Sequence, residues 1–468
     1  MTEIKAFIDQ WIDEHEAELV EDISRLVAIK SERGPAEPGA PFGTGPAKAI
    51  QEAEKMCQEY GFTTKNYENY VLTANLNENE TILDILGHLD VVDAGDGWNT
   101  DPYLAVRIGD HLFGRGTDDD KGPVVAALTA MRAIRASGVP LKYNCRLIMG
   151  SDEESGSQDL DYYFQRETSA PNTFTPDASF PVFNTEKGHF HGQFRCEWPT
   201  VTASPRVRSA GGGYRFNVIP AEAWADIVGL SENAIQQYVA EDACRIGVSA
   251  ETETLDDGAV RLKIIGRSAH AAEPENGNNG ITALFSLLSL LPLADSPSEK
   301  AIRNISKLIP HGDYNGKALG ISMDDEISGP LTLAWTVFSF GENGLEGFFD
   351  SRVPLCATEE NCLKKAEKSM QAVGFCFQGG MSAAHHTPAD SPFVQTLLSA
   401  YQTFTGEKGS CLSMGGGTYV HNIEGGVAFG AGMPGFESNL HGANEHISIC
   451  NMLTAAKIFA LVIVEMCG

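Results

Sequence analysis

Apolar strands and helices alternate in the N-terminal part of the chain, and acidic residues follow the strands directly. The segment TILDILGHLDVV from Thr81 has the apolar, β-branched composition of a buried strand, and NCRLIMG from Asn144 is a second one that runs into SDEESGS. Between them KGPVVAALTAMRAIRASGVP is a predicted helix, with Pro123 in its first turn and Gly138 at its end. This alternation predicts an α/β fold, a mostly parallel sheet covered by helices, with ligands bound beyond the carboxyl ends of the strands.

The pattern changes after FNTEKG at residues 183–188, where half-buried alternation such as AVRLKII replaces continuous apolar strands. From about Gly380 the sequence returns to helices and glycine loops, and it closes with a long apolar helix. A chain of 468 residues is also long for one compact core. We therefore predict one domain built from residues 1–188 and 381–468, interrupted by an inserted α+β domain at residues 189–380.

Strands followed by helices are predicted within the insertion. A strand at 214–220 precedes helical sequence at 221–227 and 231–247, and a strand at 259–270 precedes a helix from Ile281. Two further strands, LTLAWTVFSF and GLEGFFDSRVP, precede a helix over TEENCLKKAEKSMQAVG. The insertion therefore carries its own sheet and its own helices.

Composition excludes several classes of partner and compartment. The formal charge of −29 argues against binding nucleic acid or an anionic membrane surface. The ten cysteines form no CxxC pair, which is typical of free thiols in a reducing cytosol. The N-terminus is acidic and amphipathic rather than a secretion signal, and the apolar run from Ile281 is too short to span a membrane. We expect a soluble cytoplasmic protein.

Five short segments carry side chains that could do chemistry: GHLD, TDDDKG, SDEES, TPDAS and NLHGANEH. Taken singly, each has an ordinary structural explanation, since a strand-end histidine is usually hydrogen bonded and an acidic run is usually solvated. Together they are harder to dismiss, because several follow glycine-flanked apolar strands at successive βα junctions. The α/β rule places such junctions along one edge of the sheet.

Histidines mixed with carboxylates suit zinc, manganese or cobalt. The spacing of His88 and Asp90 lets the carboxylate accept the second N–H of the imidazole. Of the adjacent Glu153 and Glu154, one can bind metal while the other lies over an activated water. That arrangement indicates metal-assisted hydrolysis.

The ordered motifs GHLDVV, GRGTDDDKG, SDEES, PDA, GRSAHAAEPENG and NLHGANE resemble the dinuclear metallopeptidase family of aminoacylase, succinyl-diaminopimelate desuccinylase, glutamate carboxypeptidase and carnosinase. Length, the large insertion, RFNVIPAE, FFDSRVP and MGGGTY make the chain most similar to the PepV-type or Xaa-His dipeptidases of that family. The resemblance spans nearly the whole chain. It implies a zinc exopeptidase-like catalytic domain with an inserted lid domain.

The resemblance also implies a ligand set for two divalent metal ions, zinc first, with manganese or cobalt as alternatives. One ion would take His88 and Asp177, the other Glu154 and His441, and Asp119 would bridge them. Two cations there would turn the repulsion within Asp118–Asp120 into attraction. The flanking Asp118 and Asp120 are expected to face solvent, to lie at the helix N-terminus or to hydrogen bond.

Further roles follow from the same resemblance. Glu153 would be the general base, and Asp90 would orient His88 or else bind the free amino group of the substrate. On the insertion, His270 would hydrogen bond the oxyanion, while Asn217 and Arg352 would hold the substrate's backbone and carboxylate. The glycines of the MGGGTY loop form either a plain turn or a nest of N–H groups for a carboxylate, and the resemblance favours the nest: Gly415, Gly416 and Gly417. The chain has His421 where relatives often carry arginine.

The expected function is a metal-dependent dipeptidase acting on short peptides with free amino and carboxyl ends. The alternatives are an N-acyl amino acid deacylase, a carboxypeptidase of the same chemistry, or an inactive peptide-binding relative. A lid that supplies its histidine within the same chain favours a monomer, with a dipeptide as its partner.

Overall fold

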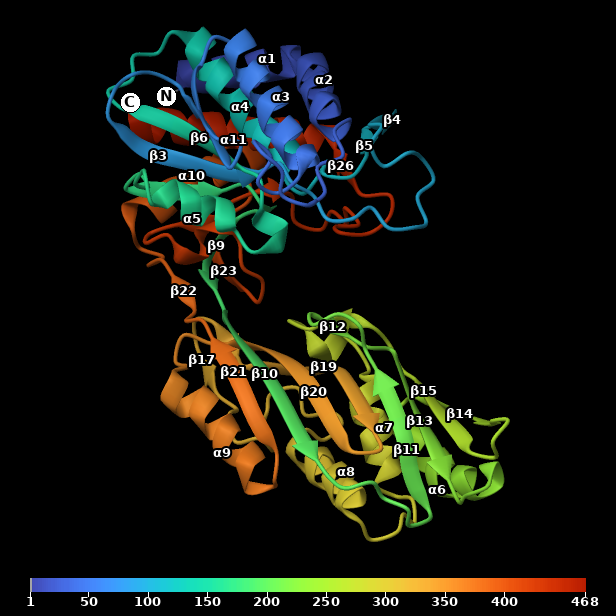
Figure 1. Ribbon diagram of the computed structural model, residues 1–468. Helices are drawn as coiled ribbons and strands as arrows, with labels where there is room; N and C mark the ends of the chain where they lie inside the picture. Colours follow the sequence, from blue (N-terminus) through green and yellow to red (C-terminus); the bar gives the residue numbers. More distant parts are fainter. Residues whose placement is uncertain (1) are drawn as a thin grey trace. The chain divides into compact units, whose positions relative to one another are not determined.

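The computed structural model describes residues 2–468, and the chain folds into two compact units (Figure 1). Unit 1 runs up to Thr185 and takes up again at His386–Leu412 and Gly417–Gly468. Unit 2 consists of Glu186–His385 and Ser413–Gly416. Each unit has its own apolar core, so each is described by itself below.

Unit 1 is built on a nine-stranded sheet in the order β1-β2-β6-β3-β7-β24-β9-β22, with β23 paired to β9. The central pairs β3–β6, β3–β7 and β7–β24 are parallel, while β1–β2, β2–β6 and β9–β24 are antiparallel. The expected α/β fold with a mostly parallel centre is confirmed. The strands are β1 (Thr63–Tyr67), β2 (Val71–Asn75), β3 (Thr81–His88), β6 (Asn144–Gly150), β7 (Asn172–Thr175), β9 (Val182–Glu186), β22 (His385–His386), β23 (Cys411–Met414) and β24 (Val427–Ala428).

Both faces of this sheet are covered, which explains why its strands are apolar without alternation. On β6, Leu147 and Met149 join the large core, whereas Ile148 joins a smaller cluster with Leu86 and Tyr419 on the other side. The helices of the large core are α1 (Thr2–Glu14), α2 (Glu16–Val27), α3 (Thr44–Glu59), α4 (Lys121–Ser137), α10 (Pro392–Thr405) and α11 (Ile449–Cys467). Helix α5 (Gln158–Phe164) and the short turn η4 (Tyr419–Asn422) contribute side chains to the smaller cluster.

Helix α11 is long and apolar enough to cross a membrane by length and composition alone, with a mean hydropathy of 1.8. In the structure 67% of that window is buried, and the helix packs against α4, α10 and β3. A buried core helix passes the same test. It is the only such candidate among residues 2–468.

The remaining strands of unit 1 are short and lie around its loops. Three of them form a small antiparallel sheet, and the other two form a parallel pair. They are β4 (Val106–Ile108), β5 (His111–Phe113), β26 (His446–Ser448), β8 (Ala178–Ser179) and β25 (Ala431–Gly432).

Unit 2 is built on an eight-stranded antiparallel sheet in the order β14-β15-β13-β11-β19-β20-β10-β21. Its helices pack with the sheet around Trp335, Phe285 and Phe349. The strands are β10 (Gly188–Glu197), β11 (Arg206–Gly212), β13 (Glu222–Val228), β14 (Ser249–Thr254), β15 (Val260–Ile265), β19 (Thr332–Gly341), β20 (Gly344–Val353) and β21 (Cys376–Met381). The helices are α6 (Glu232–Arg245), α7 (Gly280–Leu288), α8 (Pro297–Leu308) and α9 (Lys364–Ala372), the last preceded by the π-helical turn Glu359–Leu363.

The expectation of helix at 221–227 is wrong, because this segment is strand β13. Ala223, Ala225 and Ile227 are all buried, and this spacing of two residues places them on the core face of a sheet. The strand expected at 214–220 is reduced to β12 (Val218–Ile219), which pairs with β16 (Ala269–His270).

Asn279 joins a helix to the sheet of unit 2, and we expect its loss to be costly. Its Oδ1 accepts the N–H groups of Ile281 and Thr282 at 2.9 and 3.2 Å, and its Nδ2 donates to the carbonyl of Trp335 at 2.7 Å. Asn279→Ala should lower the free energy of unfolding by about 2 to 3 kcal/mol, because a helix cap and a buried hydrogen bond disappear together.

The matched control is Ser231→Ala, which removes an exposed cap of α6 that makes one bond of 3.3 Å. We expect a loss of about 0.5 kcal/mol there. Urea unfolding followed by tryptophan fluorescence measures both variants. Equal shifts of the midpoint would contradict the role given to Asn279.

Candidate metal centre

Three of the predicted ligand residues follow the parallel strands at the centre of the unit 1 sheet. His88 is the last residue of β3, Glu154 lies in the short turn after β6, and Asp177 comes two residues after β7. Parallel strands end at the same edge, so these side chains converge there. Asp119, just before α4, and His441, in a loop before β26, complete the set.

Asp119 lies at the centre of the cluster. Its Oδ1 is 2.9 Å from Nε2 of His88, and its Oδ2 is 2.7 Å from Nε2 of His441. Nε2 of His88 is also 3.6 Å from Asp177, and Nε2 of His441 is 3.5 Å from Glu154. The ligand atoms therefore form two groups, His88–Asp119–Asp177 and Asp119–Glu154–His441, each with all atoms within 4.8 Å of one another. The residue predicted as the bridge is the one that both groups share.

The donor set fits divalent cations. Nε2 of His88 and Oε1 of Glu154 are buried, and neither makes a hydrogen bond of good geometry to a described residue. Buried polar atoms are rarely left in this state. Nε2 of His88 faces the carboxylates of Asp119 and Asp177, and Oε1 of Glu154 faces Nε2 of His441. Two imidazoles and three carboxylates are also the ligands that zinc, manganese and cobalt accept.

The electrostatics of the site show how strongly it favours positive charge. The hydrogen bond to Asp119 and the close contact with Glu154 raise the pKa of His441 to about 11, and burial together with the charge of Asp119 raises the pKa of Glu154 to about 7. Burial and the Asp119 charge also raise the pKa of Asp177. Protons therefore bind tightly where the carboxylates crowd together, and metal cations would relieve the same repulsion.

Asp90 holds the turn that carries the two glutamates. Its Oδ1 accepts the N–H of Glu153 at 3.1 Å, and its Oδ2 accepts the N–H of Glu154 at 3.2 Å. Nδ1 of His88 is 3.1 Å from the backbone carbonyl of Asp90 but 3.5 Å from its carboxylate. The nearest partner of the imidazole is thus the Asp90 backbone, while the Asp90 side chain fixes the position of Glu153.

Glu445 holds the Asp119 loop in a similar way, and the sequence pattern assigned it no role. Its carboxylate accepts the N–H groups of Gly116, Asp118 and Asp119 at 2.9 to 3.2 Å and pairs with Arg115 at 2.5 Å. It is fully buried. The sequence held one signal for a role of Glu445, which is its position in NLHGANEH four residues after His441.

Of the alternatives expected for the aspartates beside the bridge, Asp120 takes the helix-N-terminal and hydrogen-bonding ones, because it is the residue that precedes α4. It is fully buried rather than solvent-facing, and its Oδ2 accepts the N–H of His88 at 3.0 Å. A side chain at Gly87 would overlap this carboxylate, which explains the glycine of GHLD. Asp118 is partly exposed, and burial of its carboxyl raises its pKa to about 7.

A tyrosine far along the chain supports the SDEES segment, and sequence reasoning missed it. The hydroxyl of Tyr419 donates to Asp159, whose carboxylate also accepts the N–H groups of Ser151 and Asp152 at 2.6 and 3.1 Å. A side chain at Gly150 would overlap the Tyr419 hydroxyl. No local pattern connects residues 260 positions apart.

The predicted substrate residues of the insertion lie together within unit 2. The carbonyl of Asn217 accepts the N–H of Ala271 at 2.8 Å, next to His270. Nη1 of Arg352 donates to the carbonyl of Gly415 at 2.8 Å. A Cβ added to Gly415 would come within 3.0 Å of Ala272 and 3.8 Å of Arg352, so no larger residue fits easily there. Gly416 belongs to the same unit, whereas Gly417 and His421 belong to unit 1.

Comparisons with known proteins found a matching family model and several similar proteins. The family model described as "Peptidase family M20/M25/M40" matches residues 85–465. YtjP of Bacillus subtilis is 32% identical over 454 residues, covering 96% of this chain and 97% of YtjP. A Beta-Ala-Xaa dipeptidase of Lactobacillus delbrueckii subsp. lactis is 29% identical over 452 residues, covering 96% of each chain. Human carnosine dipeptidase 1 has a similar fold, with a TM-score of 0.62 at 17% identity over 99% of this chain and 98% of that one.

The shared position of Asp119 leads to a prediction about metal content. Asp119→Asn removes one charge from both ligand groups, and we expect it to abolish metal retention and activity together. Asp118→Asn, whose side chain belongs to neither group, should keep both to within a few-fold. Elemental analysis after dialysis, combined with a peptidase assay, checks this, and equal damage in both variants would contradict the bridging role.

The position of Glu445 leads to a second prediction. Glu445→Gln keeps the size of the side chain but weakens three backbone contacts and the pair with Arg115. Metal affinity should fall by about 10- to 100-fold, as for other residues that hold metal ligands in place. Asp110→Asn, which alters a carboxylate bound to Ser448 and Cys450 in the same region, serves as the control and should leave metal affinity unchanged.

Proposed function

Since the chain belongs to Peptidase family M20/M25/M40 and is therefore a hydrolase, we propose that it is a metal-dependent dipeptidase for short peptides with free amino and carboxyl ends. One observation carries the proposal: two ligand groups share Asp119, and Glu153 lies next to Glu154 in the same short turn. Similarity over almost the full length to a Beta-Ala-Xaa dipeptidase supports the choice of substrate class. We further propose the PepV-type specificity, with both substrate ends bound by one chain acting as a monomer.

His88 and Asp177 would hold one divalent ion, Glu154 and His441 would hold the other, and Asp119 would contact both. Zinc is the first choice, with manganese or cobalt as alternatives. When bound, the two ions supply Lewis-acid activation of a water and of the scissile carbonyl.

Glu153 and Asp90 then provide proton transfer and the orientation of the catalytic base. Glu153 takes a proton from the attacking water and returns it to the nitrogen of the leaving amine. Asp90 keeps Glu153 in place through its backbone N–H. Both oxygens of Asp90 already accept backbone N–H groups and the residue is 1% exposed, which supports this orienting role over contact with the substrate's amino group.

Unit 2 would supply the groups that recognise the peptide. We propose that His270 donates to the oxygen of the developing oxyanion, that Asn217 binds the peptide backbone, and that Arg352 with the Gly415–Gly417 loop binds the carboxylate. The short contact between Arg352 and Gly415 supports a joint role for these two. A fixed anchor for the carboxylate would exclude peptides that extend beyond that carboxyl end.

Blocking the amino end of the substrate tests the substrate class. We expect β-Ala-His and Leu-Leu to be cleaved with a kcat/KM about 10- to 100-fold higher than their N-acetylated forms, because a buried polar group left without its partner costs about 1 to 3 kcal/mol and the acetyl group adds bulk at that end. Assays on protein reloaded with Zn²⁺, Mn²⁺ or Co²⁺ after chelation measure this. Faster cleavage of the acetylated forms would instead establish a deacylase.

The role of Glu153 is tested by Glu153→Gln, which keeps the size of the side chain but removes its capacity to accept a proton. We expect kcat to fall by about 100- to 10,000-fold with the metal content unchanged. Asp161→Asn, an exposed carboxylate on the following helix, is the matched control. A Glu153→Gln protein with full activity would remove the proposed mechanism.

A further inference from the structure

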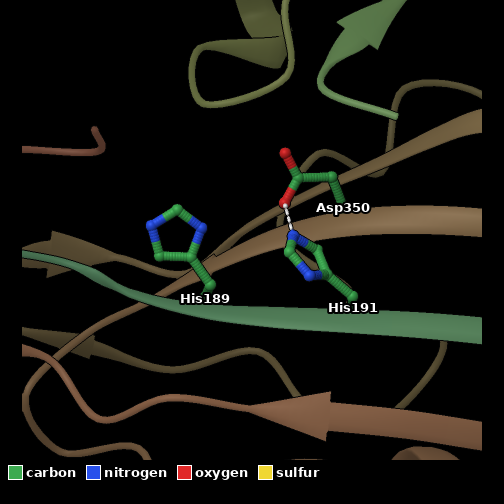
Figure 2. Close-up of side chains that lie close together, drawn as sticks. All are labelled: His189, His191 and Asp350. Atoms are coloured by element: carbon green, nitrogen blue, oxygen red, sulfur yellow. Dashed lines mark ion pairs between the residues drawn. The ribbon is translucent and has the colours of Figure 1, made fainter. Parts of the chain in front are cut away.

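A second cluster of histidines and carboxylate lies in unit 2, outside the centre described above. His189 and His191 are on β10, and Asp350 and Arg352 are on the neighbouring strand β20 (Figure 2 shows the first three). The register pairs His189 with Arg352 and His191 with Asp350. Residues two apart on a strand share a face, so the four side chains form a square on one face of the sheet.

Three of these side chains have the composition of a metal site. The ligand atoms of His189, His191 and Asp350 lie within 4.8 Å of one another, and two imidazoles with one carboxylate can bind zinc. Oδ1 of Asp350 is buried, has no hydrogen bond of good geometry, and lies 3.3 Å from Nε2 of His191 (Figure 2). Geometry alone therefore does not distinguish a metal site from an ion-pair network.

Arg352 favours the ion-pair network over the metal site, because its guanidinium is already a positive charge next to Asp350 and His189. Nη2 donates to Oδ2 of Asp350 at 2.9 Å, and Nη1 is 3.3 Å from Nε2 of His189. Arginine stays charged at any ordinary pH, so a metal ion here would meet a like charge on two of its three ligands. Burial alone would raise the pKa of Asp350, but the close contact with His191 and the charge of Arg352 hold that pKa below its usual value.

Some N–H groups of the Arg352 guanidinium remain available to a ligand. A guanidinium has five N–H donors. Nη1 uses its two toward Gly415 and His189, and Nη2 uses one toward Asp350. The second N–H of Nη2 and the N–H of Nε are left, and Nε is buried without a partner among the described residues. Two N–H groups of one guanidinium suit the two oxygens of a carboxylate.

We propose that Asp350, supported by His191, is a positioning residue that holds Arg352 so that these two N–H groups point at the carboxylate of the substrate. The proposal rests on the dipeptidase function proposed above. Arginine has a long side chain whose freedom would otherwise be lost on binding, and fixing it beforehand leaves more of the interaction free energy for the ligand. The carboxylate of Asp350 accordingly affects substrate binding through Arg352 rather than by contact.

Substitutions at Asp350 test the proposal through the separate responses of KM and kcat. Asp350→Ala should raise KM for Leu-Leu about 10-fold or more with kcat within about twofold, because one charge-assisted bond to Arg352 is lost. Asp350→Asn keeps an oxygen acceptor in place and should restore most of the affinity. Asp350→Glu keeps the charge but moves it by one methylene, so KM should rise there too. A wild-type KM in both Asp350→Ala and Asp350→Glu would overturn the proposal.

A substrate that lacks the C-terminal carboxylate distinguishes a positioning role from a purely structural one. A purely structural role would affect this substrate and the free acid equally. Leu-Leu-amide, followed as a substrate or as a competitive inhibitor, should bind the Asp350→Ala protein as it binds the wild type. Asp226→Ala is the matched control, since Asp226 is also a buried carboxylate of this sheet paired with arginines, Arg208 and Arg261. It should lower stability without changing KM. Equal losses for the acid and the amide would make Asp350 a structural residue and reject the inference.

Two further measurements separate this inference from the alternatives. If Arg352→Ala leaves the preference for the free acid over the amide unchanged, the carboxylate anchor of the proposed function fails. If Arg352→Ala removes that preference and Asp350→Ala does not, only the inference fails. Equilibrium dialysis against Zn²⁺ should give the same metal content for the wild type and His191→Ala, and loss of one ion per chain in His191→Ala would establish a metal site instead.

Discussion

The crowding of carboxylates around Asp119 is the constraint on which the rest of unit 1 depends. Asp119, Glu154 and Asp177 lie so close to two histidines that the protein must fix their loops against mutual repulsion. It does so through the backbone: Glu445 binds the N–H groups of the Asp119 loop, and Asp90 binds those of Glu153 and Glu154. The carboxylates that hold the site, Asp90 and Glu445, are both buried, whereas Glu154 and Asp177 are half-buried.

Both units contain buried carboxylates that bind several neighbouring groups. In unit 1 the buried carboxylates of Glu445 and Asp159 each satisfy several N–H groups and one further donor, Arg115 or Tyr419. In unit 2 Asp350 is held by Arg352 and His191. A buried charge is costly without partners, so each of these carboxylates holds the segments that surround it in place. The proposed division of work places hydrolysis in unit 1 and recognition of the peptide in unit 2.

Much of the candidate site could be predicted from the sequence because three of its proposed ligands follow strands directly. His88, Glu154 and Asp177 come after apolar segments whose ends had to meet at one edge of a parallel sheet, and the structure brings them together there. The helix expected at 221–227 failed for the opposite reason. A segment of alternating alanines carries too little apolar contrast to separate helix from strand, and the neighbouring strands β11 and β15 decide its conformation.

By itself, the sequence determined the α/β class, the position of the acidic loops and the residues able to bind metal, because these follow from local composition and from the order of strands and helices. Tertiary structure alone decided which side chains hold these loops. Glu445 reaches the Asp119 loop across more than 300 residues, Tyr419 reaches Asp159 across 260, and Asp350 meets His191 only through strand register. Hydrogen bonds between distant segments depend on the packing of whole elements, and no local sequence pattern encodes that packing.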